Sequence, residues 1–264
     1  MSKIKPMKII LSIIILGLCI QCKESKSKKN EQKIEQISAV NHYNFFGKSS
    51  FKFQFFSDSS YIFTIIDKDI NHEKLEKFND FCYKKNDTIY FSQTRFRYNG
   101  SKKAVIKNNF IEFIDGDFPL KIEVKKNVFH TKSKLDLKKH KDYAFFSFEE
   151  KFHERYFRNR SKNIKPLDLN QNELTELDEI LKKCFSENSS KLRNINQYLK
   201  QCIVVLNEKQ EKEIWISCYC KDFDLNETFQ YSLIDMSDGG NCNINLKINL
   251  TKHNYSNLNI SGRA

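Results

Sequence analysis

The sequence predicts an α+β protein, in which an antiparallel β-rich N-terminal region precedes a C-terminal helix packed on a curled antiparallel sheet. Short apolar and aromatic runs with a period of two recur across residues 39–150, and this period is typical of half-buried strands. In residues 169–264, an apolar stripe at helical spacing comes before four or five further strand-like runs. These two observations favour two modules, the first largely β and the second a helix covering a sheet.

Residues 1–21 have the features of a lipoprotein signal peptide. Lysines precede an apolar run from Ile9 to Ile20, and Cys22 follows directly after this run. An apolar core of about 12 residues is shorter than the roughly 20 that a membrane-spanning helix needs. We therefore predict cleavage before Cys22 and lipidation, including palmitate, at that cysteine. Lipidation at Cys19, a cleaved leader without lipid and an uncleaved signal anchor are the alternatives.

The composition after the leader is consistent with a chain that a lipid holds at the cell envelope. Residues 22–38 are almost entirely polar, so we expect a flexible tether. Lys23 does not resemble an inner-membrane retention signal, which favours the outer membrane, on its periplasmic or surface face. The net charge of +12 is spread among acidic residues along the chain, which argues against a nucleic-acid partner. The expected partners are the membrane, through the lipid, and an unknown protein or small molecule.

The first module, residues 39–150, is predicted to contain antiparallel strands joined by short turns. Asn99-Gly100 and Asn108-Asn109 are dipeptides typical of hairpin turns, because these residues accept positive φ angles. The predicted strands are Phe51–Phe55, Tyr61–Ile66, Thr88–Phe91, Ala104–Ile106, Phe110–Ile114 and Leu120–Val124.

One helix is expected to interrupt these strands, over residues 71–82. Four apolar residues recur there at helical spacing after Asn71, a suitable N-cap. They are Leu75, Phe78, Phe81 and Cys82. Further along the chain, residues 151–168 form a basic aromatic linker that Pro166 closes. Such a run usually is a solvated linker, and contact with anionic lipid head groups is the alternative.

Residues 169–264 show the clearest pattern. Asn170 and Glu173 resemble a capping box, which places a helix start there. The apolar stripe of this helix consists of Leu174, Leu177, Ile180, Leu181, Cys184 and Phe185. A short second helix is expected near residues 192–199. The strands predicted after the first helix are Cys202–Leu206, Glu213–Cys220, Phe229–Ile234, Cys242–Leu250 and Tyr255–Ile260.

The same C-terminal module, residues 170–264, resembles a group of uncharacterised bacterial lipoproteins. The resemblance is carried by Ile214–Cys220, with the pattern W-x-x-C-x-C, by Asp238–Thr251, which begins D-G-G-N-C, and by the closing Ser261–Ala264. It implies a family without an assigned activity and a cystatin-like or NTF2-like shape. This sequence departs from the pattern at Asn243, where an aromatic residue often follows the last cysteine, and at Ser261, where asparagine is usual before glycine.

The cysteines are expected to serve structure. Export permits disulfides, and Cys218 and Cys220 lie two residues apart on one predicted strand, so both point to the same face. Either could pair with Cys242, and we prefer Cys220 as the partner. Cys184 and Cys202 are expected to be buried thiols or a second disulfide.

Two alternative chemistries use the same residues. Cys218, Cys220, Cys242 and His253 could hold Zn²⁺, although C-x-C is not the spacing of common structural zinc sites. Alternatively, Cys242 could be a nucleophile with His253 as its base and the amides of Gly239-Gly240 as an oxyanion hole. The sequence shows no evident residue to orient this histidine.

Other polar and aromatic residues are expected to have structural or solvent-exposed roles. Trp215 and Tyr219 are predicted to be packing or surface aromatics on the opposite face of their strand, and a stacking platform for a sugar or base is the alternative. The carboxylate pairs Asp235 with Asp238, and Glu149 with Glu150, are expected to be solvated groups rather than acid–base partners.

No common nucleotide-binding, serine-hydrolase or metalloprotease motif is present in the sequence. The sequence therefore favours a non-enzymatic envelope lipoprotein that binds a partner or assists assembly, with no cofactor, metal or catalytic residue. An envelope hydrolase or thiol enzyme that uses Cys242 and His253 is the alternative.

Overall fold

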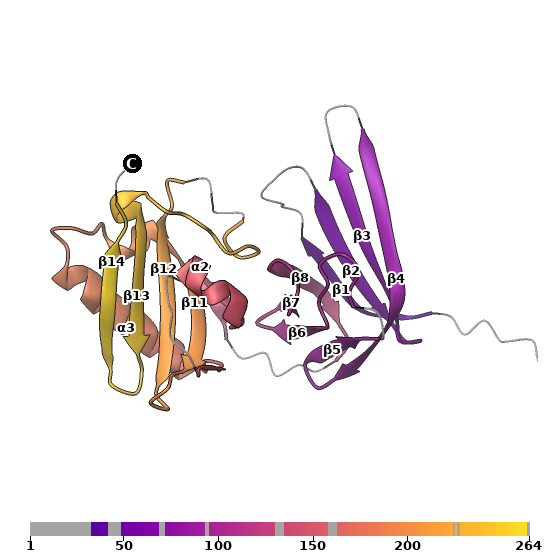
Figure 1. The fold of residues 1–264 in the computed structure, drawn as a ribbon, viewed down its shortest axis with the longest axis horizontal. Coiled ribbons are helices and arrows are strands. Elements are labelled where there is room, and N and C mark those ends of the chain that lie inside the picture. The colour runs from indigo at the N-terminus through magenta and orange to yellow at the C-terminus, as the bar shows by residue number, and fades with distance from the viewer. Residues whose placement is uncertain are drawn as a thin grey trace, which may run out of the picture. The chain divides into compact units, whose positions relative to one another are not determined.

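The computed structural model describes residues 33–41, 49–68, 72–92, 95–129, 135–157, 163–223, 225 and 228–262. The predicted leader, Cys22 and Cys19 lie outside these residues, as does most of the predicted tether. Residues Ile34–Ala264 form one compact unit. Figure 1 shows that this unit contains two separate β-sheets, and each sheet has its own hydrophobic core.

The first eight strands form a closed antiparallel barrel. Each strand pairs with the next one along the chain, and β1 also pairs with β8, which closes the ring. The strands are β1 (Glu35–Asn41), β2 (Ser50–Phe56), β3 (Ser60–Lys68), β4 (Glu73–Lys85), β5 (Thr88–Phe91), β6 (Lys103–Lys107), β7 (Phe110–Ile114) and β8 (Leu120–Asn127).

Alternating side chains fill the barrel with aromatic rings. In β2, Phe51, Phe53 and Phe55 are buried, whereas the residues between them are exposed or partly exposed. The ring of Phe63 lies 4.9 Å from that of Phe96 and 6.2 Å from that of Phe113, measured between centroids. The period-two pattern of the sequence therefore records which side chains enter the barrel.

The predicted helix over residues 71–82 is wrong, because this segment is the long strand β4. Phe78 and Cys82 point inward, whereas Leu75 and Phe81 point outward and are 52% and 59% exposed. Apolar residues on both faces of one strand produced a spacing of three and four that resembles a helix.

The turn at Asn108-Asn109 is confirmed. Both residues have positive φ angles, 47° and 67°, and they join β6 directly to β7. Asparagine tolerates this left-handed conformation better than most residues, and a tight hairpin requires it at both central positions. At the other predicted turn, Gly100 also has a positive φ angle, but it lies in a longer connection between β5 and β6.

The second sheet has six strands. Its main order is β10-β11-β12-β13-β14, and β9 pairs with β11 in parallel. The strands are β9 (Tyr143–Phe146), β10 (Lys165–Pro166), β11 (Tyr198–Leu206), β12 (Lys212–Cys220), β13 (Asn243–Asn249) and β14 (Asn254–Ile260). The short 3₁₀ helices are η1 (Leu137–Lys139), η2 (Ile195–Gln197) and η3 (Gly240–Cys242).

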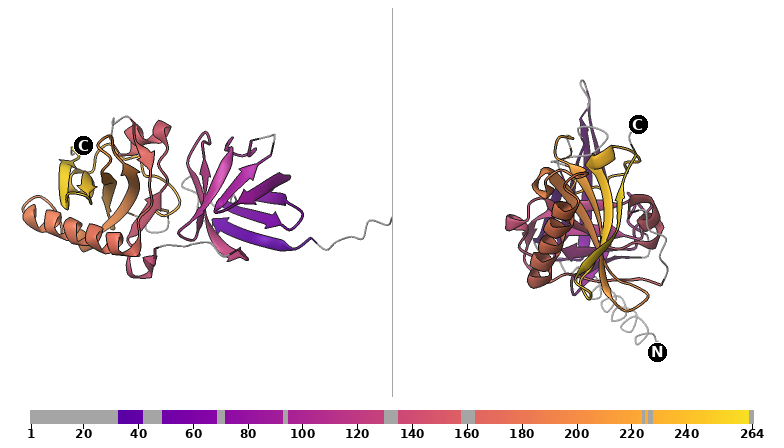
Figure 2. Two further views of the ribbon diagram at one scale, coloured as in Figure 1. Left: turned by 90° about the horizontal axis from the view of Figure 1, so that it is seen from below. Right: turned by 90° about the vertical axis from the view of Figure 1, so that its left-hand side faces the viewer.

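Helix α3 (Gln171–Glu187) covers one face of this sheet, as Figure 2 shows. The predicted capping box is confirmed: Asn170 Oδ1 accepts from the Glu173 N–H, and the Glu173 carboxylate accepts from the Asn170 N–H. The six predicted stripe residues are all buried. The other face of the sheet is covered by α2 (Glu150–Phe157) and by the chain after β12.

The predicted α+β fold class is nevertheless wrong, as is the cystatin-like or NTF2-like shape. The described part of the chain is mostly β, and its larger sheet closes into a barrel. Strand periodicity shows which face of a strand is buried, but it does not show that the first strand meets the eighth. The parallel pair of β9 and β11 also departs from the purely antiparallel sheet that we expected.

Four local expectations also need correction. The segment Phe229–Ile234 is a loop, because the Gln201 side chain binds the Phe229 and Ser232 carbonyls and the Ile234 N–H. Strand β1 begins inside the predicted tether 22–38, and α2 occupies the start of the predicted linker 151–168. In place of a second helix near residues 192–199, the chain forms η2 and the start of β11.

Among the described helices, none combines the length and apolar character needed to cross a membrane.

Candidate functional site

The predicted disulfide between Cys220 and Cys242 is present. Cys220 ends β12, Cys242 ends η3 just before β13, and their Cα atoms are 4.7 Å apart. The bond therefore joins the ends of two adjacent strands. The bond also involves two of the three cysteines of the zinc alternative, and it includes Cys242, the predicted nucleophile.

The structure separates His253 from the cysteines. Cys242 precedes β13 and His253 follows it, so the seven residues of that strand lie between them. At about 3.4 Å per residue, this places the two roughly 20 Å apart. His253 Nδ1 pairs instead with the Glu176 carboxylate on the surface of α3. The predicted nucleophile and base are therefore not brought together, and within the described residues no three potential metal ligands cluster.

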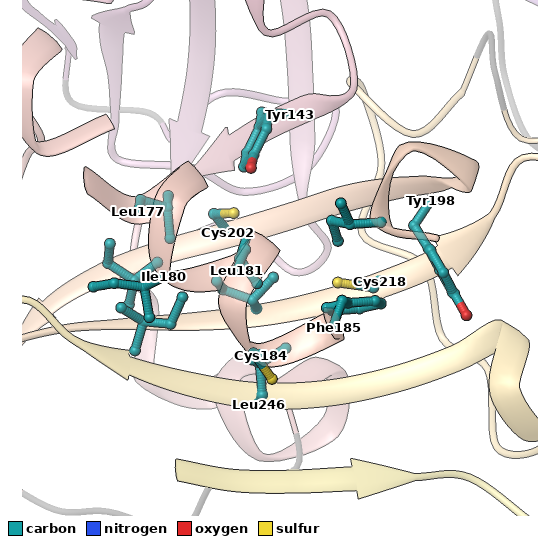
Figure 3. Close-up of a cluster of buried hydrophobic side chains, with 14 of the residues drawn as sticks. Tyr143, Leu177, Ile180, Leu181, Cys184, Phe185, Tyr198, Cys202, Cys218 and Leu246 are labelled. Carbon is teal, nitrogen blue, oxygen red and sulfur yellow. The ribbon is translucent and has the colours of Figure 1, made fainter. Parts of the chain in front are cut away.

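Three free thiols lie in the core between α3 and the sheet, as Figure 3 shows. Burial raises the pKa of Cys184 to about 12 and that of Cys218 to about 12, and it raises the pKa of Cys202 well above its ordinary value. A thiol is nucleophilic only as the thiolate, so these groups are unreactive near neutral pH. The expectation of buried thiols at Cys184 and Cys202 is confirmed.

The backbone groups of the glycine-rich loop before Cys242 form hydrogen bonds that stabilise the loop itself. Gly239 has a φ of 109°, which strongly favours glycine. The Gly240 N–H donates to the Gly262 carbonyl, so it is not available to an oxyanion. The Asn243 side-chain amide donates to the carbonyls of Met236 and Asp238, at 2.7 and 2.8 Å. The D-G-G-N-C motif therefore acts here as a turn that positions the disulfide.

Trp215 and Tyr219 are packing residues, as predicted. Both point to the face of the sheet opposite α3 and are almost completely buried. The Tyr219 hydroxyl donates to the Ile234 carbonyl at 3.0 Å, and the Trp215 indole N–H donates to Glu213. Neither ring is available to stack on a ligand.

The two carboxylate pairs are not acid–base partners. Asp235 pairs with Arg155, whereas the carbonyl of Asp238 accepts from Asn243. Glu150 is exposed, but Glu149 is half-buried and accepts from the Asp115 N–H at 2.8 Å. Burial raises the pKa of Glu149 to about 7. This carboxyl accepts a hydrogen bond from a backbone amide, so the expectation that Glu149 is solvated is wrong, whereas Glu150 is exposed as expected.

A buried ion pair, which the sequence analysis missed, lies on the outer face of the barrel. Glu112 on β7 and Lys121 on β8 are opposite each other, and their charged atoms are 3.4 Å apart. Lys121 Nζ also donates to the Phe145 carbonyl of β9 at 2.6 Å, and Glu112 accepts from the Ser147 N–H at 2.8 Å. The pair therefore links the barrel to the segment that begins the second sheet.

Two aromatic rings enclose the lysine of this pair. The Lys121 ammonium lies 4.3 Å from the ring centroid of Phe110 and 4.3 Å from that of Phe146. Burial lowers the pKa of Lys121 to about 8, although Glu112 favours the charged form. The sequence signal for this pair is one charged residue in each of two strongly apolar strands. It was missed because strand alternation places both residues on the solvent-facing side.

A cleft of about 370 Å³ is the candidate binding site. One wall is formed by β6 and β7 of the barrel, with Val105, Ile106 and Ile114, and another by the segment 166–169. Charged groups edge it in two ion pairs, Lys107 with Asp168, and Lys103 with Asp115 at 3.9 Å. Its size and its mixture of apolar walls with a few charged groups fit a small polar ligand.

Comparison with other proteins gives no further indication of the ligand. The chain matches no protein-family model, no curated protein and no solved structure. The resemblance of residues 170–264 to bacterial lipoproteins stays a prediction.

Proposed function

We propose that this protein is a lipid-anchored component of the cell envelope that acts by binding rather than by catalysis. The observation that carries the proposal is the chemical state of the cysteines near the predicted site. The one predicted nucleophile, Cys242, is held in a disulfide, and Cys184, Cys202 and Cys218 are buried with raised pKa values. Disulfides persist in oxidising compartments, so the bond supports export together with the leader sequence.

The cleft lined by β6, β7 and residues 166–169 is the proposed binding site for a small polar molecule. It lies in the size range of small-ligand pockets, and its rim carries two lysine–aspartate ion pairs whose charges can orient such a molecule.

The location is tested by metabolic labelling with palmitate in cells that make the full-length chain. Cys22→Ala should abolish the label and release the protein from the membrane fraction, whereas Cys19→Ala should leave both unchanged. Label that persists in Cys22→Ala, or a wild-type protein without label, would disprove the lipid anchor at Cys22.

The binding proposal is tested by thermal-shift measurements with amino acids, dipeptides and small sugars as probes. Val105→Trp fills the cleft, and Val128→Trp makes the same change at an exposed site outside it. At least one probe class should stabilise the wild type and Val128→Trp but not Val105→Trp. If no probe stabilises the wild type, or if Val105→Trp responds equally, the cleft is not the binding site.

A further inference from the structure

Strand β4 carries an open edge. All of Glu73–Phe81 pairs with β3, but only Cys82–Lys85 pairs with β5 on the other side. Figure 1 shows β3 and β4 as long neighbouring strands. The longer strand therefore extends beyond its second neighbour, and an unpaired strand edge is a template for another strand.

The backbone groups on this open side can be identified from the hydrogen bonds at the end of β4. The Cys82 N–H donates to the Ser59 carbonyl on the β3 side, and the Phe81 carbonyl accepts from Ser92 on the β5 side. Because bonding direction alternates along a strand, odd-numbered residues of β4 face away from β3. Within the described residues, the backbone groups of Leu75, Lys77 and Asn79 have no strand partner there.

The side chains along this edge are self-complementary. Residues 73–77 read Glu-Lys-Leu-Glu-Lys. If a second copy pairs antiparallel with a two-fold axis at Leu75, Lys74 lies opposite Glu76 of the second copy and Glu73 lies opposite its Lys77. Each pairing occurs twice because of the symmetry, so every charged residue of the segment faces an opposite charge.

Neighbouring registers lack this match. An axis one residue earlier places Lys74 against Lys74 of the second copy, and an axis one residue later places Glu76 against the second copy's Glu76. The segment is therefore specific for one register. Exposed charges commonly prevent edge pairing, but here the charges favour a single pairing and oppose the adjacent ones.

The apolar residues support the same axis. Leu75 is 52% exposed on the outer face of the barrel, and Ile66 lies opposite it on β3. Pairing about Leu75 would place Ile66 and Leu75 of both copies in one apolar row across the joined sheets. A two-fold contact of this kind closes on itself and does not propagate into a fibre.

We propose that two copies of this protein associate edge to edge through β4, antiparallel, with the two-fold axis at Leu75. This inference goes beyond the proposed binding function and does not depend on the cleft. It assigns a role to the exposed apolar and charged residues of β4, which the ligand-binding proposal does not use.

Cysteine cross-linking of the full-length chain in membranes tests the axis. Residues that face each other in a hydrogen-bonded antiparallel pair have Cα atoms about 5.5 Å apart, within disulfide range. Leu75→Cys should therefore give a disulfide-linked dimer on mild oxidation, whereas Asn79→Cys, on the same edge but away from the axis, should not. A Leu75→Cys protein that stays monomeric, or equal cross-linking of both variants, would overturn the proposal.

Charge exchange tests the register. Copurification of two differently tagged full-length copies should fall about tenfold or more for Lys74→Glu alone and for Glu76→Lys alone. It should return when the two changes are combined in one chain, and also when a Lys74→Glu copy is mixed with a Glu76→Lys copy.

The matched control for these variants is Lys52→Glu, the same charge change at an exposed position of β2. It should copurify like the wild type. If the single variants keep wild-type association, or if the mixed pair does not recover it, β4 pairing in this register is excluded. A merely structural effect of the substitutions would not produce recovery in the mixed pair.

Discussion

The barrel and the second sheet solve the same problem of burying a β-sheet in different ways. The barrel closes on itself, leaves part of β4 without a second strand neighbour, and fills its interior with aromatic rings. The second sheet stays open and relies on a hydrophobic core on each face, with α3 covering one of them, and on the Cys220–Cys242 bond. The comparison teaches that the closed barrel is held by strand pairing around the ring and by its packed interior, whereas the open sheet also needs a helix over one face and a disulfide between two of its strands.

The largest effect is expected from Phe63→Ala in the barrel. Phe63 is fully buried among aromatic rings, and truncation of a buried phenylalanine costs about 3–5 kcal/mol. Urea unfolding followed by circular dichroism measures the loss. The only tryptophan, Trp215, lies in the second sheet, so its fluorescence reports whether that sheet unfolds independently.

The control for this prediction is Phe118→Ala, since Phe118 is 41% exposed. It should cost less than about 1 kcal/mol. Equal losses for the two variants would show that aromatic packing does not hold the barrel.

The next largest effect is expected from removal of the disulfide in the second sheet. The two cysteines are 22 residues apart, and a loop of this size corresponds to about 3 kcal/mol of unfolding free energy. Cys220→Ala combined with Cys242→Ala should lower stability by this amount, as measured through Trp215 fluorescence. Reducing agent should destabilise the wild type but leave the double variant unchanged; a wild type insensitive to reduction would contradict the contrast with the barrel.

The buried pair between the two regions predicts a pH effect. Because the pKa of Lys121 is lowered to about 8 from an ordinary 10.5, the unfolded chain holds this proton at pH values where the folded chain has lost it. The lysine therefore makes stability rise with pH between about 8 and 10.5, by about 3 kcal/mol in total.

Chemical unfolding across this pH range measures the rise. Lys121→Met with Glu112→Gln removes it while keeping an acceptor for the Ser147 N–H. Lys125→Met, an exposed change on the same strand, should keep the wild-type slope. If the double variant has the wild-type slope, Lys121 does not titrate in this window.

The smallest effect is expected at the start of α3. Asn170→Ala removes the side-chain acceptor for the Glu173 N–H and should cost about 1 kcal/mol, again seen through Trp215. Asn172→Ala, an exposed change in the same first turn, should be within about 0.5 kcal/mol of the wild type. A larger loss at Asn172 than at Asn170 would show that the cap does not anchor the helix that covers the open sheet.

Local features of this protein could be predicted from its sequence because neighbouring residues determine them. Spacings of a few residues determine the capping box at Asn170, the helix stripe and the turn at Asn108-Asn109. The pairing of Cys220 with Cys242 was predicted because an exported protein can form disulfides. Most strands of the barrel were likewise visible as alternation.

Features that depend on contacts between distant residues could not be predicted. Barrel closure, the parallel pairing of β9 with β11, and the burial of Lys121 all arise from segments that meet only in the folded chain. Strand β4 was mistaken for a helix because it carries apolar residues on both faces, Phe78 and Cys82 toward the barrel core and Leu75 and Phe81 toward solvent.

The pairing of β1 with β8 has a consequence for how the chain folds. Ile37 pairs with Asn127, ninety residues later in the chain. The barrel therefore cannot close until nearly half of the polypeptide is available to fold. Contacts this remote slow folding, since a long segment must be ordered before its two ends meet. Until β8 pairs with β1, the incomplete barrel has two unpaired strand edges. During this interval the chain is most exposed to proteases and to mispairing with other chains.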